Sequence, residues 1–160
     1  MPRAAAVVAA SDTILPIRHP ACRAPAHKTM PESHLTPTGD SPPTEIRLRR
    51  KSRVVEVVFA DGARYALSFE YLRSHSPSAE VQGHGPGQDV LQIAKENVAV
   101  LKLEPVGRYA VRLVFDDGHD TGLYTWAYLR ELGATFEERW ARYLKRLDGI
   151  GYVRKPAPPA

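Results

Sequence analysis

The fold of this 160-residue chain is decided by the stretch Phe115–Trp126, which reads FDDGHDTGLYTW. A strand of alternating apolar residues runs into the pair Asp117–Gly118, where glycine takes the positive φ of a tight hairpin turn without steric cost. His119 follows the turn directly, and Tyr124 and Trp126 come soon after it. Packing alone does not require this combination, so the stretch predicts both a hairpin and a candidate site.

A second stretch of the chain is similar to this hairpin. Val57–Gly62, VVFADG, is similar to Leu113–Gly118, LVFDDG, and the triplet Tyr71–Arg73 is similar to Tyr128–Arg130. The offset is 56 positions for the Asp-Gly pairs and 57 for the triplets. Two hairpin-plus-helix units that differ by one inserted residue account for this pattern, and chance similarity between short hairpins is the alternative.

Periodicity and turn residues outside these hairpins predict further strands and short helices. We expect strands near residues 45–49, 54–59, 64–67, 98–103 and 109–115, with another short strand after Gly118, and helices at 69–73, 126–132 and 136–147. Ser68 is expected to cap the first helix and Gly133 to end the second. Thr135 and Glu138 are expected to form a capping box for the last helix. The Gly- and Pro-rich segment Val81–Gln88 is expected to hold no regular element.

Proline placement predicts the domain boundaries. Residues 1–43 hold eight of the 14 prolines, and proline denies hydrogen bonds to both helices and sheets. We therefore expect a disordered, Pro-rich leader over 1–43, a folded domain over 44–153 and a loose tail over 154–160. A targeting segment and a start codon assigned too early both account for the composition of the leader.

The overall composition excludes several classes of protein. No run approaches the roughly 18 apolar residues that a membrane span needs. The chain has 22 Lys and Arg and 18 Asp and Glu, so its positive and negative charges are nearly balanced. This favours a mixed, solvated surface over a nucleic-acid-binding patch. The one cysteine, Cys22, cannot form an internal disulfide or a cysteine-based zinc site, and a reducing, cytoplasmic location is the default expectation.

Four stretches carry a resemblance to a known family: Phe69–Val81, Gly83–Gln88, Tyr109–His119 and Phe136–Trp140. Together they resemble the gamma-butyrobetaine hydroxylase-like N-terminal domain family, in its stand-alone bacterial branch, whose function is uncharacterised. The resemblance covers Ile46–Leu147 and implies an α+β domain with a small, mostly antiparallel sheet and short helices.

The resemblance also implies a departure from the family's metal site. In the oxygenase branch the domain holds a structural zinc through three Cys and one His, which correspond here to Ser76, Ser78, Val81 and His119. Serine hydroxyls bind zinc poorly and valine not at all, so a Cys3His zinc site is not expected. Neither is hydroxylase activity, because about 110 folded residues cannot also hold the catalytic jelly roll, and no His-x-Asp or His-x-Glu triplet occurs. Other members are fused to P-loop ATPases of the iron–sulfur carrier type, which implies an accessory role by association alone.

Histidines supply the remaining candidates for a metal site. His119 lies between Asp117 and Asp120, which makes it a candidate metal ligand or ligand-binding group, or a turn histidine bonded to its neighbours. His75 and His84 flank a Ser/Pro/Gly-rich loop, and with His119 they would form a three-imidazole site for a divalent transition metal. Exposed loop histidines are the alternative.

Three functions remain open, and no catalytic residue or nucleotide-cofactor site is assigned. The first is a non-catalytic binding or adaptor module that docks an unidentified protein partner or a metal-related assembly; a homodimer is a separate open alternative. The binding surface of the module would combine loop 74–88 with Asp117, His119, Asp120, Tyr124 and Trp126. The second is a metal-dependent enzyme or metal-binding regulator that uses the three histidines. The weakest is nucleic-acid binding through a basic face of the last helix, formed by Arg139, Arg142, Lys145 and Arg146.

Overall fold

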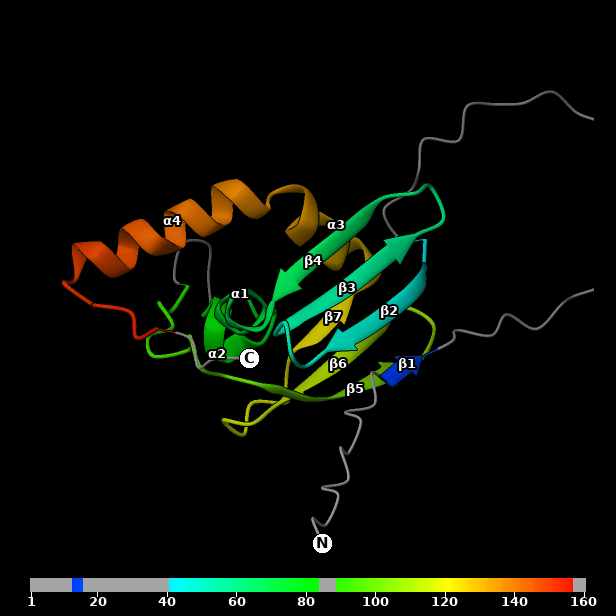
Figure 1. Ribbon diagram of the computed structural model, residues 1–160, viewed down its shortest axis with the longest axis horizontal. Helices are drawn as coiled ribbons and strands as arrows, with labels where there is room; N and C mark the ends of the chain where they lie inside the picture. The colour runs from blue at the N-terminus through cyan, green and yellow to red at the C-terminus, as the bar shows by residue number, and fades with distance from the viewer. Residues whose placement is uncertain (1–12, 16–40, 84–88, 157–160) are drawn as a thin grey trace, which may run out of the picture.

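The computed structural model describes residues 13–15, 41–83 and 89–156 (Figure 1). One antiparallel sheet has the order β1 (Thr13–Leu15), β2 (Pro43–Arg49), β3 (Val54–Phe59) and β4 (Arg64–Ser68). A second has the order β5 (Val100–Val106), β6 (Ala110–Phe115) and β7 (Leu123–Thr125). The helices are α1 (Phe69–Ser74), α2 (Ala79–Gln82), α3 (Trp126–Ala134) and α4 (Phe136–Gly149). The predicted α+β class and antiparallel pairing are confirmed, although the strands form two sheets rather than one.

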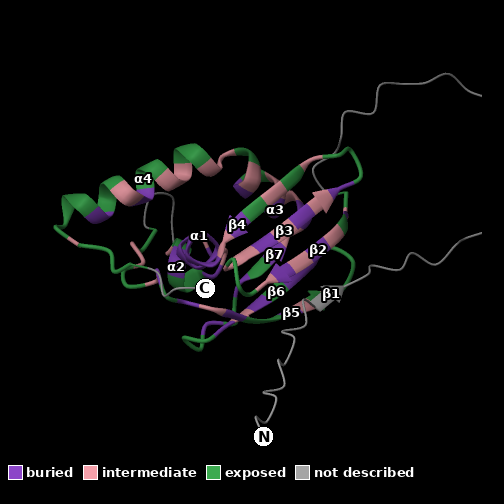
Figure 2. Ribbon diagram, in the orientation of Figure 1, coloured by how far each residue is buried: buried purple, intermediate pink, exposed green. Residues whose placement is uncertain are grey.

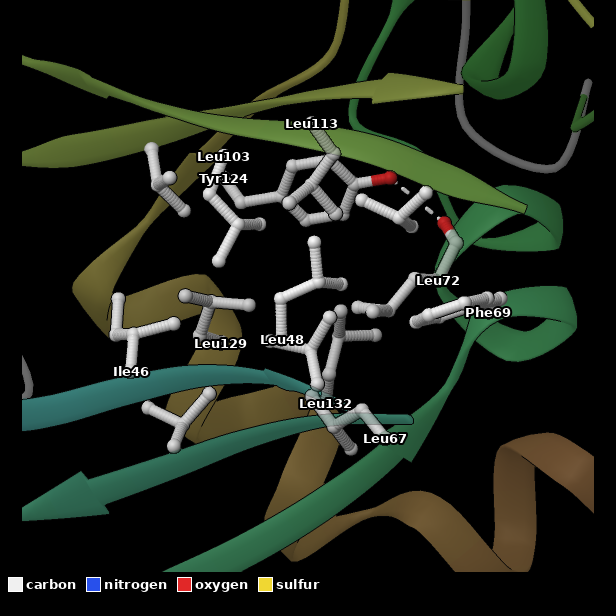
Figure 3. Close-up of a cluster of buried hydrophobic side chains, with 14 of the residues drawn as sticks. Ile46, Leu48, Leu67, Phe69, Leu72, Leu103, Leu113, Tyr124, Leu129 and Leu132 are labelled. Carbon is white, nitrogen blue, oxygen red and sulfur yellow. Dashed lines mark hydrogen bonds between the residues drawn. The ribbon is translucent and has the colours of Figure 1, made fainter. Parts of the chain in front are cut away.

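The hydrophobic core joins the two sheets and the helices. Side chains from β2, β4, β5, β6 and α3 meet in one cluster, in which Leu48, Leu113 and Leu129 are almost fully buried (Figure 3). Helix α1 is buried along its whole length (Figure 2). Helix α4 buries only Tyr143 and Leu147 and leaves most of its surface exposed or half-buried.

The predicted internal repeat is present in the structure. A first half, β2–β3–β4–α1, and a second half, β5–β6–β7–α3, have the same order of elements. Gly62 (φ +87°) and Gly118 (φ +83°) make equivalent hairpin turns, and each amide donates to the carbonyl of the phenylalanine three positions earlier. Ser68 and Thr125 cap the following helices, each accepting from the amide of a tyrosine three positions later.

Contacts between the halves are exchanged reciprocally, as across a two-fold axis. The Tyr71 hydroxyl donates to the Leu132 carbonyl at 3.0 Å, and the Tyr128 hydroxyl donates to the His75 carbonyl at 2.8 Å. The tyrosines are 57 positions apart, and so are the two acceptor residues. If one element contacts its counterpart and the counterpart returns the same contact, the interface is self-complementary.

Two ion pairs between the halves are exchanged in the same reciprocal way. Arg73 pairs with Asp117 of the second hairpin at 2.8 Å, and Arg130 pairs with Asp61 of the first at 2.5 Å. Each helix thus sends its arginine to the turn of the other half. The repeat is therefore a property of the packing as well as of the sequence.

Three local predictions were wrong. Helix α3 continues through Gly133, where a Cβ atom would collide with the ring of Tyr65, so this glycine permits close packing rather than ending the helix. Thr135 makes no side-chain capping bond, because its hydroxyl donates to the Glu131 carbonyl and accepts from Arg139. Finally, α2 occupies the start of the segment expected to be irregular, because Val81 is drawn into the protein interior.

The two ends of the domain also differ from the expectation. Residues Thr13–Leu15, within the expected leader, pair with β2, whereas the rest of 1–40 lies outside the described residues. In the expected tail, Arg154 pairs with the buried Glu70, and the amide of Lys155 donates to Glu96 at 2.9 Å. No helix in the described part of the chain is long and apolar enough to cross a membrane.

Candidate functional site

The His119 side chain lies in a closed polar cluster behind the second hairpin turn. Its Nε2 lies 2.8 Å from the Ser76 hydroxyl and 3.4 Å from the Ser78 hydroxyl. Its Nδ1 lies 3.0 Å from a carboxylate oxygen of Glu80. The turn itself is fixed by the His119 amide, which donates to the Asp117 side chain at 3.2 Å. Each ring nitrogen of His119 therefore has a partner.

This cluster unites positions that the family resemblance relates to a zinc site. The side chains of Ser76 and Ser78 both lie within hydrogen-bonding distance of the His119 ring. Val81, which is close to the serines in sequence, is buried on α2. Hydroxyl–imidazole hydrogen bonds now connect these residues. Within the described ranges, no group of three or more His, Cys, Asp or Glu side chains is placed to hold a metal ion. His84 lies outside the described residues, so its part in a histidine site stays a prediction.

Ser76, His119 and Glu80 follow the order of a serine–histidine–carboxylate triad, but the serine cannot serve as a nucleophile in this conformation. Ser76 is 0% exposed, and Gly122 lies so close to its hydroxyl that a Cβ there would collide with it. A nucleophile must reach the carbonyl carbon that it attacks. We therefore interpret the cluster as a structural hydrogen-bond network.

Burial sets the charge of the cluster. Desolvation lowers the pKa of His119, and the nearby Arg73 lowers it further, while Glu80 opposes both effects. The imidazole is then neutral at pH 7 and carries one proton. A proton on Nδ1 donates to Glu80 and leaves Nε2 to accept from Ser76, so one tautomer satisfies both contacts.

Of the other residues of the expected binding surface, the two aromatic residues are buried and the two aspartates are exposed. Tyr124 is fully buried and donates to the Leu72 carbonyl at 2.7 Å (Figure 3). Trp126 is 4% exposed, and its indole N–H donates to the Arg108 carbonyl at 2.6 Å. Asp117 is held by Arg73 and Lys95, and Asp120 is exposed. The side chains of His119, Tyr124 and Trp126 thus stabilise the fold and present little surface to a partner.

His75 faces a different part of the molecule. Its Nδ1 lies 3.0 Å from the Tyr71 carbonyl, and its ring packs against the rings of Tyr71 and Tyr143. Burial lowers the pKa of His75, and the charges of Arg139 and Arg142 act in the same direction. The structure brings His75 not to His119 but to the wall of a cleft.

This α4 cleft, of about 510 Å³, is lined by the ends of α1 and α2, by residues 89–92 and by α4. Its polar lining includes the side chains of His75, Tyr128, Tyr143, Arg139, Arg142 and Arg146. Asp89 is the acidic residue of the lining, so three arginines face one carboxylate. The sequence pattern predicts that the three arginines belong to a solvated face of the last helix. Their spacing at 139, 142 and 146 places them on one side of α4, but the sequence does not show that this side borders a cleft.

Each arginine of the α4 cleft already holds a carboxylate. Arg139 pairs with Glu131, and Arg146 pairs with Asp89. Arg142 pairs with Glu138 at 2.6 Å, one helical turn away. The side chains of these three carboxylates are 53%, 56% and 71% exposed. Exposed ion pairs contribute only about 0–1 kcal/mol to stability, so the arginines can exchange these partners at little cost.

Comparisons with known proteins place this architecture in a family. Two NMR solution structures are similar: one is 46% identical, covers 72% of this chain and 91% of its own, and has a TM-score of 0.63. The other is 44% identical, covers 83% and 96%, and has a TM-score of 0.64. A crystal structure of a protein of unknown function of the DUF971 family from Acidithiobacillus ferrooxidans ATCC 23270 is also similar. It is 44% identical, covers 61% of this chain and 98% of its own, and has a TM-score of 0.51.

No curated protein matches the chain. The family model described as gamma-butyrobetaine hydroxylase-like, N-terminal, matches residues 46–130, which is more than half of the sequence. The match includes most of both halves of the repeat and the residues of the His119 cluster. The chain belongs to the gamma-butyrobetaine hydroxylase-like N-terminal family.

Proposed function

We propose that this protein is a non-catalytic binding module, whose ligand site is the α4 cleft and whose ligand carries negative charge. The main support for this proposal is the lining of that cleft, where three arginines and His75 lie beside two tyrosines. Guanidinium groups donate in a planar fork that fits carboxylates and phosphates. A concave site with a few convergent polar groups is the usual form of a ligand-binding site.

The His119 cluster is a weaker candidate for the ligand site than the α4 cleft. His119 is 5% exposed and both of its ring nitrogens are hydrogen-bonded, so it offers no free group to a ligand. The α4 cleft combines an open volume with charged groups that have exchangeable partners. An adaptor role near metal or iron–sulfur assemblies rests on the family resemblance and would use the same cleft for its partner.

A backbone NMR titration of the full chain with citrate, and separately with pyrophosphate, tests the proposal. We expect shifts concentrated on His75, on residues 89–92 and on the cleft-facing turns of α4. Arg142→Gln should weaken binding by about fivefold, which corresponds to the loss of about 1 kcal/mol. Lys145→Gln is the matched control, because it removes the same charge from an exposed position of α4 outside the cleft lining.

Two results would contradict the proposal. One is the absence of shifts at millimolar anion. The other is a uniform response of all basic surface residues, with Lys145→Gln as damaging as Arg142→Gln, because that pattern describes general charge attraction rather than a site.

A further inference from the structure

We infer that the α4 cleft takes an extended acidic segment of a partner protein, whose alternate carboxylates pair with Arg139, Arg142 and Arg146. This inference rests on the proposed function and names the class of its ligand. Three features of the cleft carry it: the spacing of the arginines, the carboxylates that they already hold, and the apolar part of the lining.

The arginines form a row rather than a single pocket. Residues three or four positions apart on a helix are neighbours, with Cβ atoms about 5–6 Å apart. Seven positions of α4 extend about 10 Å along the helix axis. In an extended chain, side chains on one face recur about every 6.6 Å, so acidic residues at alternate positions match such a row. One small anion would reach only part of it.

The three arginines already pair with carboxylates of this protein. Glu131, Glu138 and Asp89 each offer a carboxylate to one arginine of the row, and all three are more than half exposed. These contacts hold the guanidinium groups in place while contributing little to stability. A partner's carboxylates can replace them, because the exchange substitutes one ion pair for another of the same chemistry.

The remaining lining favours a peptide over an inorganic anion. The Tyr143 hydroxyl donates to the Gln92 carbonyl at 2.9 Å, and the Tyr128 hydroxyl donates to the His75 carbonyl. Both hydroxyl protons are therefore committed. Tyr143 is buried, so the half-buried ring of Tyr128 supplies the aromatic surface of the cleft. The exposed Val90 and the half-buried Leu91 add aliphatic surface to the cleft. A free phosphate has no group for such a wall, whereas the side chains between the acidic residues of a peptide do.

Fluorescence anisotropy with the full chain tests the inference. The probes are three labelled hexapeptides: one with glutamate and alanine in alternation, one with three alanines followed by three glutamates, and one with glutamine in place of each glutamate. The alternating peptide should bind at least about threefold more tightly than its contiguous isomer, and the glutamine peptide should not bind. Pyrophosphate serves as competitor and should displace the alternating peptide only partly or at high concentration.

Variants of α4 sharpen the test. Glu138→Gln removes a competing carboxylate and should raise the affinity for the alternating peptide, whereas Arg142→Gln should lower it. Lys145→Gln should leave it unchanged. Circular dichroism of each variant verifies that the fold is kept, and all three positions are exposed on the helix surface.

Equal binding of the two glutamate peptides, or an unchanged affinity on Glu138→Gln, would overturn the inference. Tighter binding of pyrophosphate than of any peptide would do the same, and would leave the α4 cleft as a small-anion site in agreement with the proposed function. If neither pyrophosphate nor a peptide binds, both the inference and the proposed function fail.

Discussion

The two halves of this protein share one skeleton but differ in what they add to it. Each half has a hairpin with an Asp-Gly turn, a Ser or Thr cap and a helix whose tyrosine reaches into the other half. The residue after the first turn is the half-buried Ala63, whereas the residue after the second is the buried, fully hydrogen-bonded His119. The skeleton therefore does not need the histidine, and the polar cluster is an addition to one half.

The helices after the repeat differ as well. Helix α2 follows the first half and has four residues, whereas α4 follows the second and has 14. The α4 cleft lies where these unequal helices meet the end of α1. Features that could carry function thus lie where the internal symmetry is broken, and the symmetric parts maintain the fold.

The strongest test of the shared skeleton uses its two close glycine contacts. Gly133→Ala would force a Cβ atom into the base of the Tyr65 ring, and we expect a loss of about 1–3 kcal/mol in the free energy of unfolding. Gly122→Ala meets the Ser76 hydroxyl and should cost less, because that hydroxyl can rotate away from His119. Urea denaturation measures both. Gly149→Ala, which meets no neighbour, is the control and should change stability by less than about 1 kcal/mol.

If Gly133→Ala is as stable as the wild type, close packing against Tyr65 does not explain this glycine.

The exchanged ion pairs test how closely the halves match in energy. The side chain of Arg73 is 9% exposed and that of Arg130 is 18% exposed, and their partners Asp117 and Asp61 are 23% and 37% exposed. Arg73→Met should cost about 1.5–3 kcal/mol, because it removes a hydrogen bond to a charged group and leaves Asp117 with Lys95 as its charged partner and with the His119 amide. Arg130→Met should cost less in the same chemical denaturation experiment. An equal or larger loss for Arg130→Met would show that burial does not set the difference.

The smallest expected effect is the pH dependence that His119 of the second half contributes. The pKa of His119 is lowered from its ordinary value of 6.5, so the unfolded chain takes up this proton more readily than the folded chain. The contribution of His119 to stability is complete above about pH 6.5 and falls as the pH drops toward its folded pKa. The urea midpoint should therefore drop less between pH 7.5 and 5.5 in His119→Asn than in the wild type. Identical drops would remove the histidine from this pH response.

Much of the fold is predictable from the sequence because it depends on local rules. The Asp-Gly pairs predict both hairpins, Ser68 predicts the start of α1, and the offset between the two hairpins predicts the repeat. The errors arise where tertiary contacts override local preference. A glycine at position 133 favours the end of a helix. The structure shows instead that a side chain there would collide with the Tyr65 ring, which is 68 positions away in sequence.

The candidate sites show the same division. The association of His119 with Ser76 and Ser78 follows from the family resemblance, and the structure places these residues together. The α4 cleft could not be predicted, because its walls come from α1, α2, residues 89–92 and α4. From the sequence, Arg139, Arg142 and Arg146 have the pattern of a solvated helix face. Only packing shows which side of that face borders a cavity.

The exchanged tyrosine bonds have a consequence for how the chain folds. They join residues 61 and 53 positions apart, so neither helix can complete its contacts before both hairpins have formed and met. Contacts between distant parts of a chain slow folding, because the entropy of closing the loop is lost before any contact compensates it. The halves should therefore assemble and come apart together in one cooperative transition, although each looks like a small folding unit of its own.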